Sequence, residues 1–133
     1  MWNSRGWDGI KKGEIDYLSK IIEPDVGVIT NINYAHAKNF KNIKQIALAK
    51  SEIIDNIRPN GFIVLNADDS FFKLHYHIAK KKNIKVISFG IKNLKADIKL
   101  IDIKPFRKKF RINISLNNKR KYFLLSNDFQ NNI

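Results

Sequence analysis

Residues 26–65 read VGVITNINYAHAKNFKNIKQIALAKSEIIDNIRPNGFIVL, and this stretch decides the fold class. It opens with the β-branched run VGVITNI at 26–32, which is typical of a buried strand. The spacing of apolar residues predicts a helix over 42–57, which ends before the turn PNG at 59–61. The run FIVL at 62–65 predicts a second buried strand. A strand, a helix and a strand in this order predict parallel pairing with a right-handed crossover.

The flanking sequence continues this alternation of helices and strands. Residues 14–22 predict a short helix before the first strand. Its apolar face comprises Ile15, Leu18, Ile21 and Ile22. After the second strand, Asp68 or Asp69 can cap a helix over 70–82, and residues 85–90 predict a third strand.

Beyond residue 95 the pattern changes to antiparallel strands, predicted at 97–103, 108–116 and 120–125. Within the second of these, apolar and polar residues alternate from Phe110 to Leu116, and Asn117-Asn118 follows as a tight turn. The predicted fold class is therefore α/β: a partial doubly wound parallel sheet with a small antiparallel β extension.

The composition excludes several classes of protein. A hydrophobic content of 44% supports a packed core and excludes a disordered tail. The chain has no cysteine, which excludes a disulfide scaffold and fits a reducing compartment. No apolar run reaches membrane-spanning length, and residues 1–10 show no secretory signal. The net charge of +13 leaves a basic nucleic-acid-binding domain as an alternative function, although the basic residues are dispersed and lack interleaved aromatic residues.

Lys50 is the most informative single position. On a helical wheel of residues 42–57 it falls in the middle of an arc of isoleucines and alanines. Burying an unpaired ammonium group is costly, so this placement needs a reason. Either the stem lies on the core while the amine reaches water, or the amine has a special chemical role.

The histidines differ in their expected roles. His36 follows the first predicted strand in a loop, where open α/β sheets bind ligands, although a surface loop histidine is the alternative. His75 shares a helical face with apolar residues and is predicted to pack. His75 and His77 do not share a face, so this pair is a poor metal site.

Five motifs follow one another in a fixed order. They are GEI-x-YLS-x-I at 13–21, TNI at 30–32, AH-x-x-x-F at 35–40, AK-x-EI at 49–53 and VLNADD at 64–69. In this order and spacing they resemble the central domain of the Mur ligases, clearly over residues 13–90 and more weakly to about residue 126. Within the family, the resemblance is strongest to the branch that adds D-alanyl-D-alanine to UDP-N-acetylmuramoyl-tripeptide.

The resemblance implies a cytoplasmic, ATP- and Mg²⁺-dependent ligase of peptidoglycan precursor synthesis. Such enzymes phosphorylate a carboxylate to an acyl phosphate, which the incoming amine attacks to form an amide. By motif, His36 matches the magnesium-ligating histidine. Lys50 matches the family's lysine that is carbamylated by carbon dioxide. Asn131, in SNDFQNNI at 126–133, is the weak match to a residue that contacts adenine.

The chain also departs from the family pattern. The phosphate-binding loop G-x-x-G-K-T/S does not occur, and the position of the acidic ligand before GEI falls near Gly6 or Trp7, which cannot bind a metal. We therefore interpret residues 1–12 as an irregular segment unlike the family, and 13–133 as a truncated central domain without the C-terminal domain. We expect a monomer that is inactive alone. A catalytically dead binding module of the same fold is the second alternative.

Overall fold

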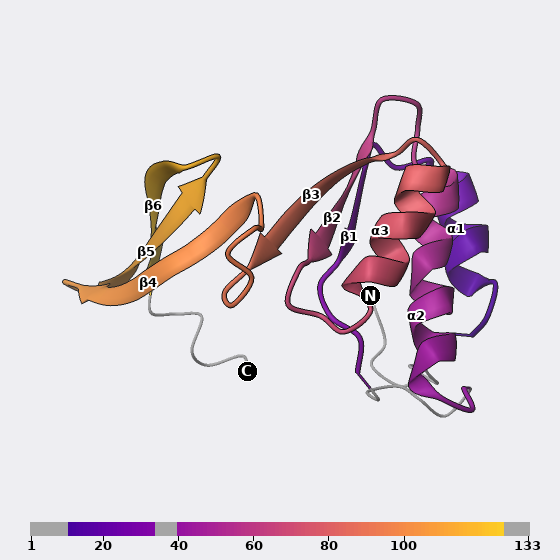
Figure 1. Ribbon diagram of the computed structural model, residues 1–133, viewed down its shortest axis with the longest axis horizontal. Helices are drawn as coiled ribbons and strands as arrows, with labels where there is room; N and C mark the ends of the chain where they lie inside the picture. Colours follow the sequence, from indigo (N-terminus) through magenta and orange to yellow (C-terminus); the bar gives the residue numbers. More distant parts are fainter. Residues whose placement is uncertain (1–10, 34–39, 127–133) are drawn as a thin grey trace, which may run out of the picture. The chain divides into compact units, whose positions relative to one another are not determined.

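The computed structural model describes residues 11–33 and 40–126 of the chain. The chain divides into two compact units, Met1–Ile87 and Ser88–Ile133 (Figure 1). Strand β3 (Lys85–Gly90) contributes to both, because the division falls within it. No helix in the described ranges is long and apolar enough to cross a membrane.

The first unit alternates helices and parallel strands. Its strands lie in the order β1-β2-β3, and β1 pairs with β2 in parallel, with Val26 opposite Phe62. Figure 1 shows α1, α2 and α3 on one side of β1 and β2. The elements that precede β3 in this unit are α1 (Glu14–Ile22), β1 (Val26–Ile29), α2 (Ile43–Ser51), the 3-10 helix η2 (Glu52–Asn56), β2 (Phe62–Asn66) and α3 (Phe72–Lys81).

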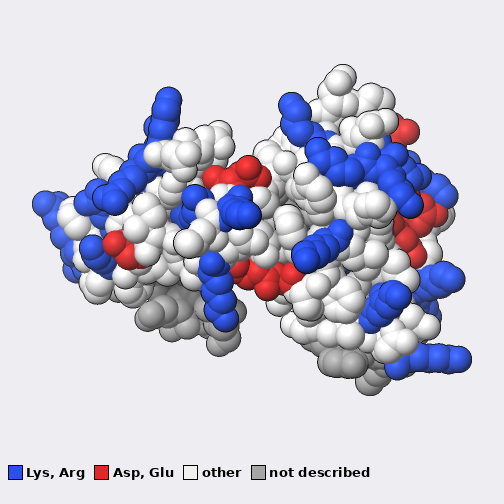
Figure 2. Space-filling model, in the orientation of Figure 1, with Lys and Arg blue, Asp and Glu red and all other residues white. Residues whose placement is uncertain are grey.

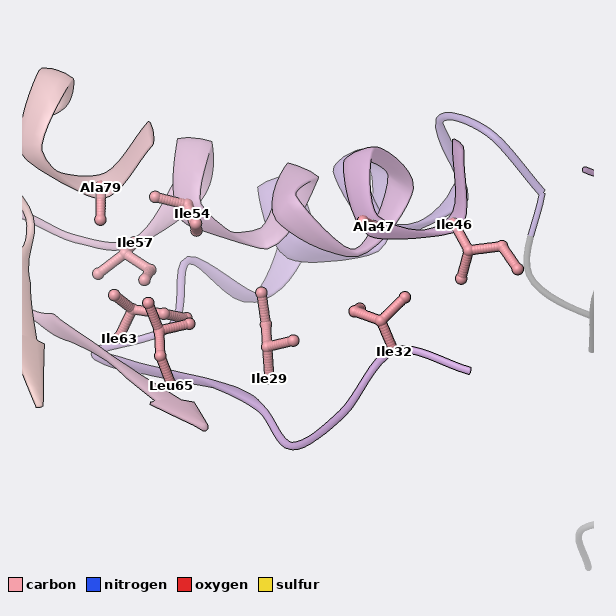
Figure 3. Packing of buried hydrophobic residues seen from close by; sticks show 9 residues of the cluster. All are labelled: Ile29, Ile32, Ile46, Ala47, Ile54, Ile57, Ile63, Leu65 and Ala79. Atoms are coloured by element: carbon pink, nitrogen blue, oxygen red, sulfur yellow. The ribbon is translucent and has the colours of Figure 1, made fainter. Parts of the chain in front are cut away.

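The core of this unit lies between the helices and the strands (Figure 3). Ile63 and Leu65 of β2 and Ile54 of η2 are almost fully buried. Strand β1 shows which face is covered, because Gly27 and Ile29 are buried while Val26 and Val28 are exposed. The cluster comprises Ile29, Ile32, Ile46, Ala47, Ile54, Ile57, Ile63, Leu65 and Ala79.

Helix α1 has the predicted bounds, but its apolar face does not pack on this core. Leu18, Ile21 and Ile22 are exposed, and Ser19 is the buried residue of the helix. The reason is a polar contact with η2. The Asn56 side-chain amide donates to Ser19 Oγ at 2.8 Å and to Asp16 Oδ1 at 3.0 Å, so the polar side of α1 faces inward.

Two predicted boundaries also differ from the structure. The first strand ends at Ile29 rather than at residue 32. The helix predicted over 42–57 begins with an Asn42 cap, whose side chain accepts from Gln45 N at 3.0 Å, but it tightens to 3-10 geometry from Glu52 onward. Such 3-10 turns are common at the carboxyl ends of α-helices, and apolar periodicity alone does not reveal them.

The second unit is a twisted ladder in the order β3-β4-β5-β6. Strand β4 (Ile98–Phe106) pairs with β3 in parallel, whereas β4, β5 (Lys109–Leu116) and β6 (Lys119–Ser126) pair antiparallel. Asn117 and Asn118 both have positive φ, as the tight turn between β5 and β6 requires. The predicted fold class, with a parallel α/β part and an antiparallel extension, is confirmed.

Candidate functional site

Lys50 lies in the last turn of α2 and points to the carboxyl end of β1. Its Nζ donates to the backbone carbonyl of Asn31 at 3.0 Å, two residues after the strand ends at Ile29. The wheel prediction is confirmed, because Ile46 and Ile54 on the same helical stretch are buried and Lys50 itself is half-buried. The amine therefore lies where ligands bind in open α/β sheets.

A small, open cavity of about 190 Å³ lies beside Lys50. Its walls are mostly apolar, and it is lined by Ile15, Val28, Ile29, Thr30, Lys50 and Ile53. In the described part of the chain, no ion pair involves Lys50, so its hydrogen-bond acceptor there is a neutral carbonyl. An amine on an apolar wall without a carboxylate partner is suited to a change of its own charge, because no existing ion pair would be broken.

Asp69 joins the segments that follow the first two strands. Its Oδ2 accepts from Ile32 N at 2.8 Å, and its Oδ1 accepts from Phe71 N at 2.8 Å. One carboxylate therefore fixes the chain after β1 and the start of α3, which holds Asn31 beside Lys50. The sequence predicted Asp69 as a possible helix cap but not its bond to Ile32, which is 37 residues away.

His75 is a packing residue, as predicted. The side chain is 2% exposed, and Nε2 lies 2.9 Å from the carbonyl oxygen of Ala47, so the ring donates from Nε2. Burial lowers the pKa of His75, because the charged ring would lose its hydration. A neutral histidine committed to a core hydrogen bond is not available for a bound metal.

Two predicted site residues, His36 and Asn131, lie outside the described residues, so their positions relative to Lys50 stay predictions. Within the described ranges, no group of three His, Cys, Asp or Glu side chains could hold a metal ion. The Lys50 ammonium would repel Mg²⁺. The described residues alone therefore do not form a magnesium site.

Comparison with known proteins places this geometry in a family. Residues 9–127 match the model of the Mur ligase middle domain. The UDP-N-acetylmuramoyl-tripeptide–D-alanyl-D-alanine ligase of Buchnera aphidicola is 39% identical over 87 residues, which are 64% of this chain and 18% of that protein. The ligase of the same name from Rickettsia prowazekii is 34% identical over 109 residues, covering 81% of this chain and 24% of that protein.

Solved structures agree with the sequence comparison. A crystal structure of MurF from Acinetobacter baumannii superposes with a TM-score of 0.74 at 29% identity, over 87% of this chain and 24% of that one. The chain thus spans about a fifth to a quarter of the length of these relatives. The match by family model extends over most of the sequence, and the chain belongs to the Mur ligase middle domain family.

Proposed function

We propose that this chain is part of the ATP-binding domain of a cytoplasmic ligase that joins D-alanyl-D-alanine to UDP-N-acetylmuramoyl-tripeptide. The relatives from Buchnera aphidicola and Rickettsia prowazekii, which are ligases of this name, support the reaction. The observation that carries the proposal is the Lys50 amine, held at the carboxyl end of β1 in an apolar cavity and free of ion pairs in the described residues.

Lys50 would act as a carbamate. The ammonium first gives up one proton to solvent. The neutral amine then attacks carbon dioxide, which forms the N–C bond, turns one C=O into C–O⁻ and releases a second proton, so a cation becomes an anion. The Asn31 carbonyl accepts a hydrogen bond from the amine but cannot donate one to a carbamate. The carbamate oxygens would therefore turn away from this carbonyl. We propose that in a complete enzyme they would help to hold Mg²⁺ and substrate, together with His36, which lies outside the described residues.

ATP would supply the phosphoryl group that activates the substrate carboxylate. The sequence contains no G-x-x-G-K-T/S loop, and the described residues offer no complete metal site. Because such a reaction requires nucleotide, acid and amine to be held together, we expect no turnover from this chain alone.

A chimera tests the proposal. Residues 13–126 replace the matching segment of the Buchnera ligase, and phosphate release is measured with ATP, the tripeptide substrate and D-alanyl-D-alanine. The proposal expects tripeptide-dependent release that Lys50→Ala lowers by roughly a hundredfold or more, and that short carboxylic acids partly restore. Lys44→Ala, at an exposed position of the same helix, is the matched control.

Two other outcomes would contradict the proposal. Activity that survives Lys50→Ala would make Lys50 a packing residue. A folded chimera that binds the tripeptide substrate but never turns over would favour a catalytically inactive binding module.

A further inference from the structure

Most of the positive charge of the chain lies in the antiparallel unit. Residues 88–126 contain eleven Lys and Arg, two Asp and no Glu, which gives this segment a formal charge of +9 out of +13 for the whole sequence. Figure 2 shows basic side chains spread over the surface, with acidic side chains in the minority. Charge alone does not define a binding site; the basic side chains must also gather on one face of the sheet.

The register of the strands gathers polar residues on one face. Arg111 and Asn113 of β5 alternate with apolar residues, so both project from the same side of the sheet. Asn113 lies opposite Asp102 on β4 and opposite Tyr122 on β6, while Arg111 lies opposite Lys104. A β-bulge between Leu100 and Asp102 keeps this face irregular.

A cavity of about 430 Å³ opens among these side chains. Its volume is in the range of small-molecule sites, roughly 300–1,000 Å³. It lies wholly within the antiparallel unit and is lined by Ile101, Asp102, Lys104, Arg111, Asn113, Arg120, Lys121 and Tyr122.

The charges in this cavity are not balanced. Asp102 accepts a hydrogen bond from Asn113 and pairs with Lys104 at 3.0 Å. The Asn113 amide and the Lys104 ammonium both lower the pKa of Asp102, so it stays ionised. In the described ranges, Arg111, Arg120 and Lys121 form no ion pair.

Arg111 is the best-placed of these cations. Its guanidinium lies over the Tyr122 ring, 4.3 Å from the centroid, which fixes the plane of the group. Its Nε is buried and has no hydrogen-bond partner among the residues that the structure describes. Because Nε is buried, the two terminal nitrogens are the ones that can present parallel N–H bonds to a pair of phosphate oxygens.

We propose that this cavity is a phosphate-binding site, in which Arg111 contacts the phosphate oxygens and Arg120, which lies opposite Ser115 on the same face, neutralises its charge. Asp102 does not cancel the site, because Lys104 balances its charge and leaves Arg111 and Arg120 in excess. The phosphate can belong to a free small molecule or to a polynucleotide backbone. The volume of about 430 Å³ is that of a small-molecule site, which favours the free small molecule over a strand that tracks a groove along its length.

Titration calorimetry of the whole chain with sodium tripolyphosphate at low ionic strength tests the site. We expect one ligand per chain, and roughly tenfold weaker binding for Arg120→Gln, because one charge-assisted contact is lost. Lys108→Gln, outside the cavity in the same unit, is the matched control and should change the affinity less than about twofold. Arg111→Lys keeps the charge and the aliphatic chain but loses the paired N–H donors of the guanidinium. It should therefore also weaken binding while the chain stays folded.

Three results would overturn the proposal: no binding, several ligands per chain, or equal weakening by Arg120→Gln and Lys108→Gln. The last two would show diffuse charge only. A single-stranded oligothymidylate titrated in parallel distinguishes the sources of the phosphate. Binding of the oligonucleotide without binding of tripolyphosphate would also contradict the proposal and indicate a nucleic-acid surface.

Discussion

The Glu52 carboxylate caps helix α1 at Gly13, although the two residues are 39 positions apart. Oε1 and Oε2 accept from Gly13 N at 3.0 and 3.1 Å, and Oε2 also accepts from Asp16 N at 3.2 Å. Gly13 has φ of 85° and carries no side chain that could cap the helix itself. The motif AK-x-EI therefore has two roles: Lys50 lies at the candidate site, and Glu52 holds the helix of the preceding motif.

Replacing Glu52 should loosen α1. Glu52→Ala removes the acceptor of two backbone N–H groups and a negative charge at a helix N-terminus, which together should cost about 1–2 kcal/mol of unfolding free energy. Urea unfolding followed by circular dichroism measures this loss. Glu23→Ala is the control. The Glu23 carboxylate is exposed and its ion pair with Arg58 is long, at 3.9 Å, so this variant should cost less than about 0.5 kcal/mol. Equal losses for the two variants would rule out the cap.

The sequence predicted the parts of the fold that depend on local pattern. The bounds of α1 and β3, the Asn117-Asn118 turn and the inward side of Lys50 follow from periodicity and turn chemistry. The sequence did not predict the inward polar side of α1, because that side is chosen by Asn56, some forty residues along the chain.

In the candidate site, too, features that depend on local pattern were predicted and features that depend on distant residues were not. Lys50 was predicted because an amine among isoleucines is unusual in a helical pattern. The bond of Asp69 to Ile32 was not, since a side chain that bonds a distant backbone N–H leaves no periodic signal. His36 was singled out by its place after the first predicted strand, its metal-binding role came from the motif, and its position stays a prediction.

Two buried glycines should differ in their tolerance of a methyl group. A Cβ at Gly61 would lie 2.5 Å from the carbonyl oxygen of Asp25, which is backbone and cannot move cheaply. A Cβ at Gly27 would meet the end of the Ile63 side chain at 2.7 Å, and this end can rotate away. We expect Gly61→Ala to cost about 2–3 kcal/mol and Gly27→Ala clearly less, measured by urea unfolding. The reverse order would contradict this account of the two sites.

His75 should make the stability of the chain depend on pH. Its pKa in the folded state lies below the ordinary value of 6.5, because burial disfavours the charged ring. Between the two values the unfolded chain binds a proton that the folded chain does not. Stability should therefore fall as the pH drops below about 6.5 and level off below the folded pKa.

Unfolding free energies measured from pH 8 to pH 5 test this dependence. His75→Gln can still donate to the Ala47 carbonyl but does not titrate, so its profile should be flatter than that of the original chain. His77→Gln, at an exposed position of the same helix, should keep the original slope. A slope that survives His75→Gln would assign the dependence to other groups.

Asp69 should control the order of the segment beside Lys50. Its two oxygens accept hydrogen bonds from Ile32 N and Phe71 N, both at 2.8 Å. The carbonyl of the neighbouring residue, Asn31, accepts a hydrogen bond from the Lys50 amine. Asp69→Ala should leave two backbone donors without partners and cost about 2–3 kcal/mol. Asp69→Asn should cost nearly as much, since one of the two side-chain oxygens becomes an NH₂ group that faces an N–H donor.

Hydrogen exchange resolves the effect by residue: the Ile32 and Phe71 amides should lose protection in both variants. Asp55→Asn, at an exposed pair with Lys82, should leave both amides protected. If the Ile32 amide stays protected in Asp69→Ala, then Asp69 does not hold this segment, and the placement of the Lys50 amine must depend on other contacts.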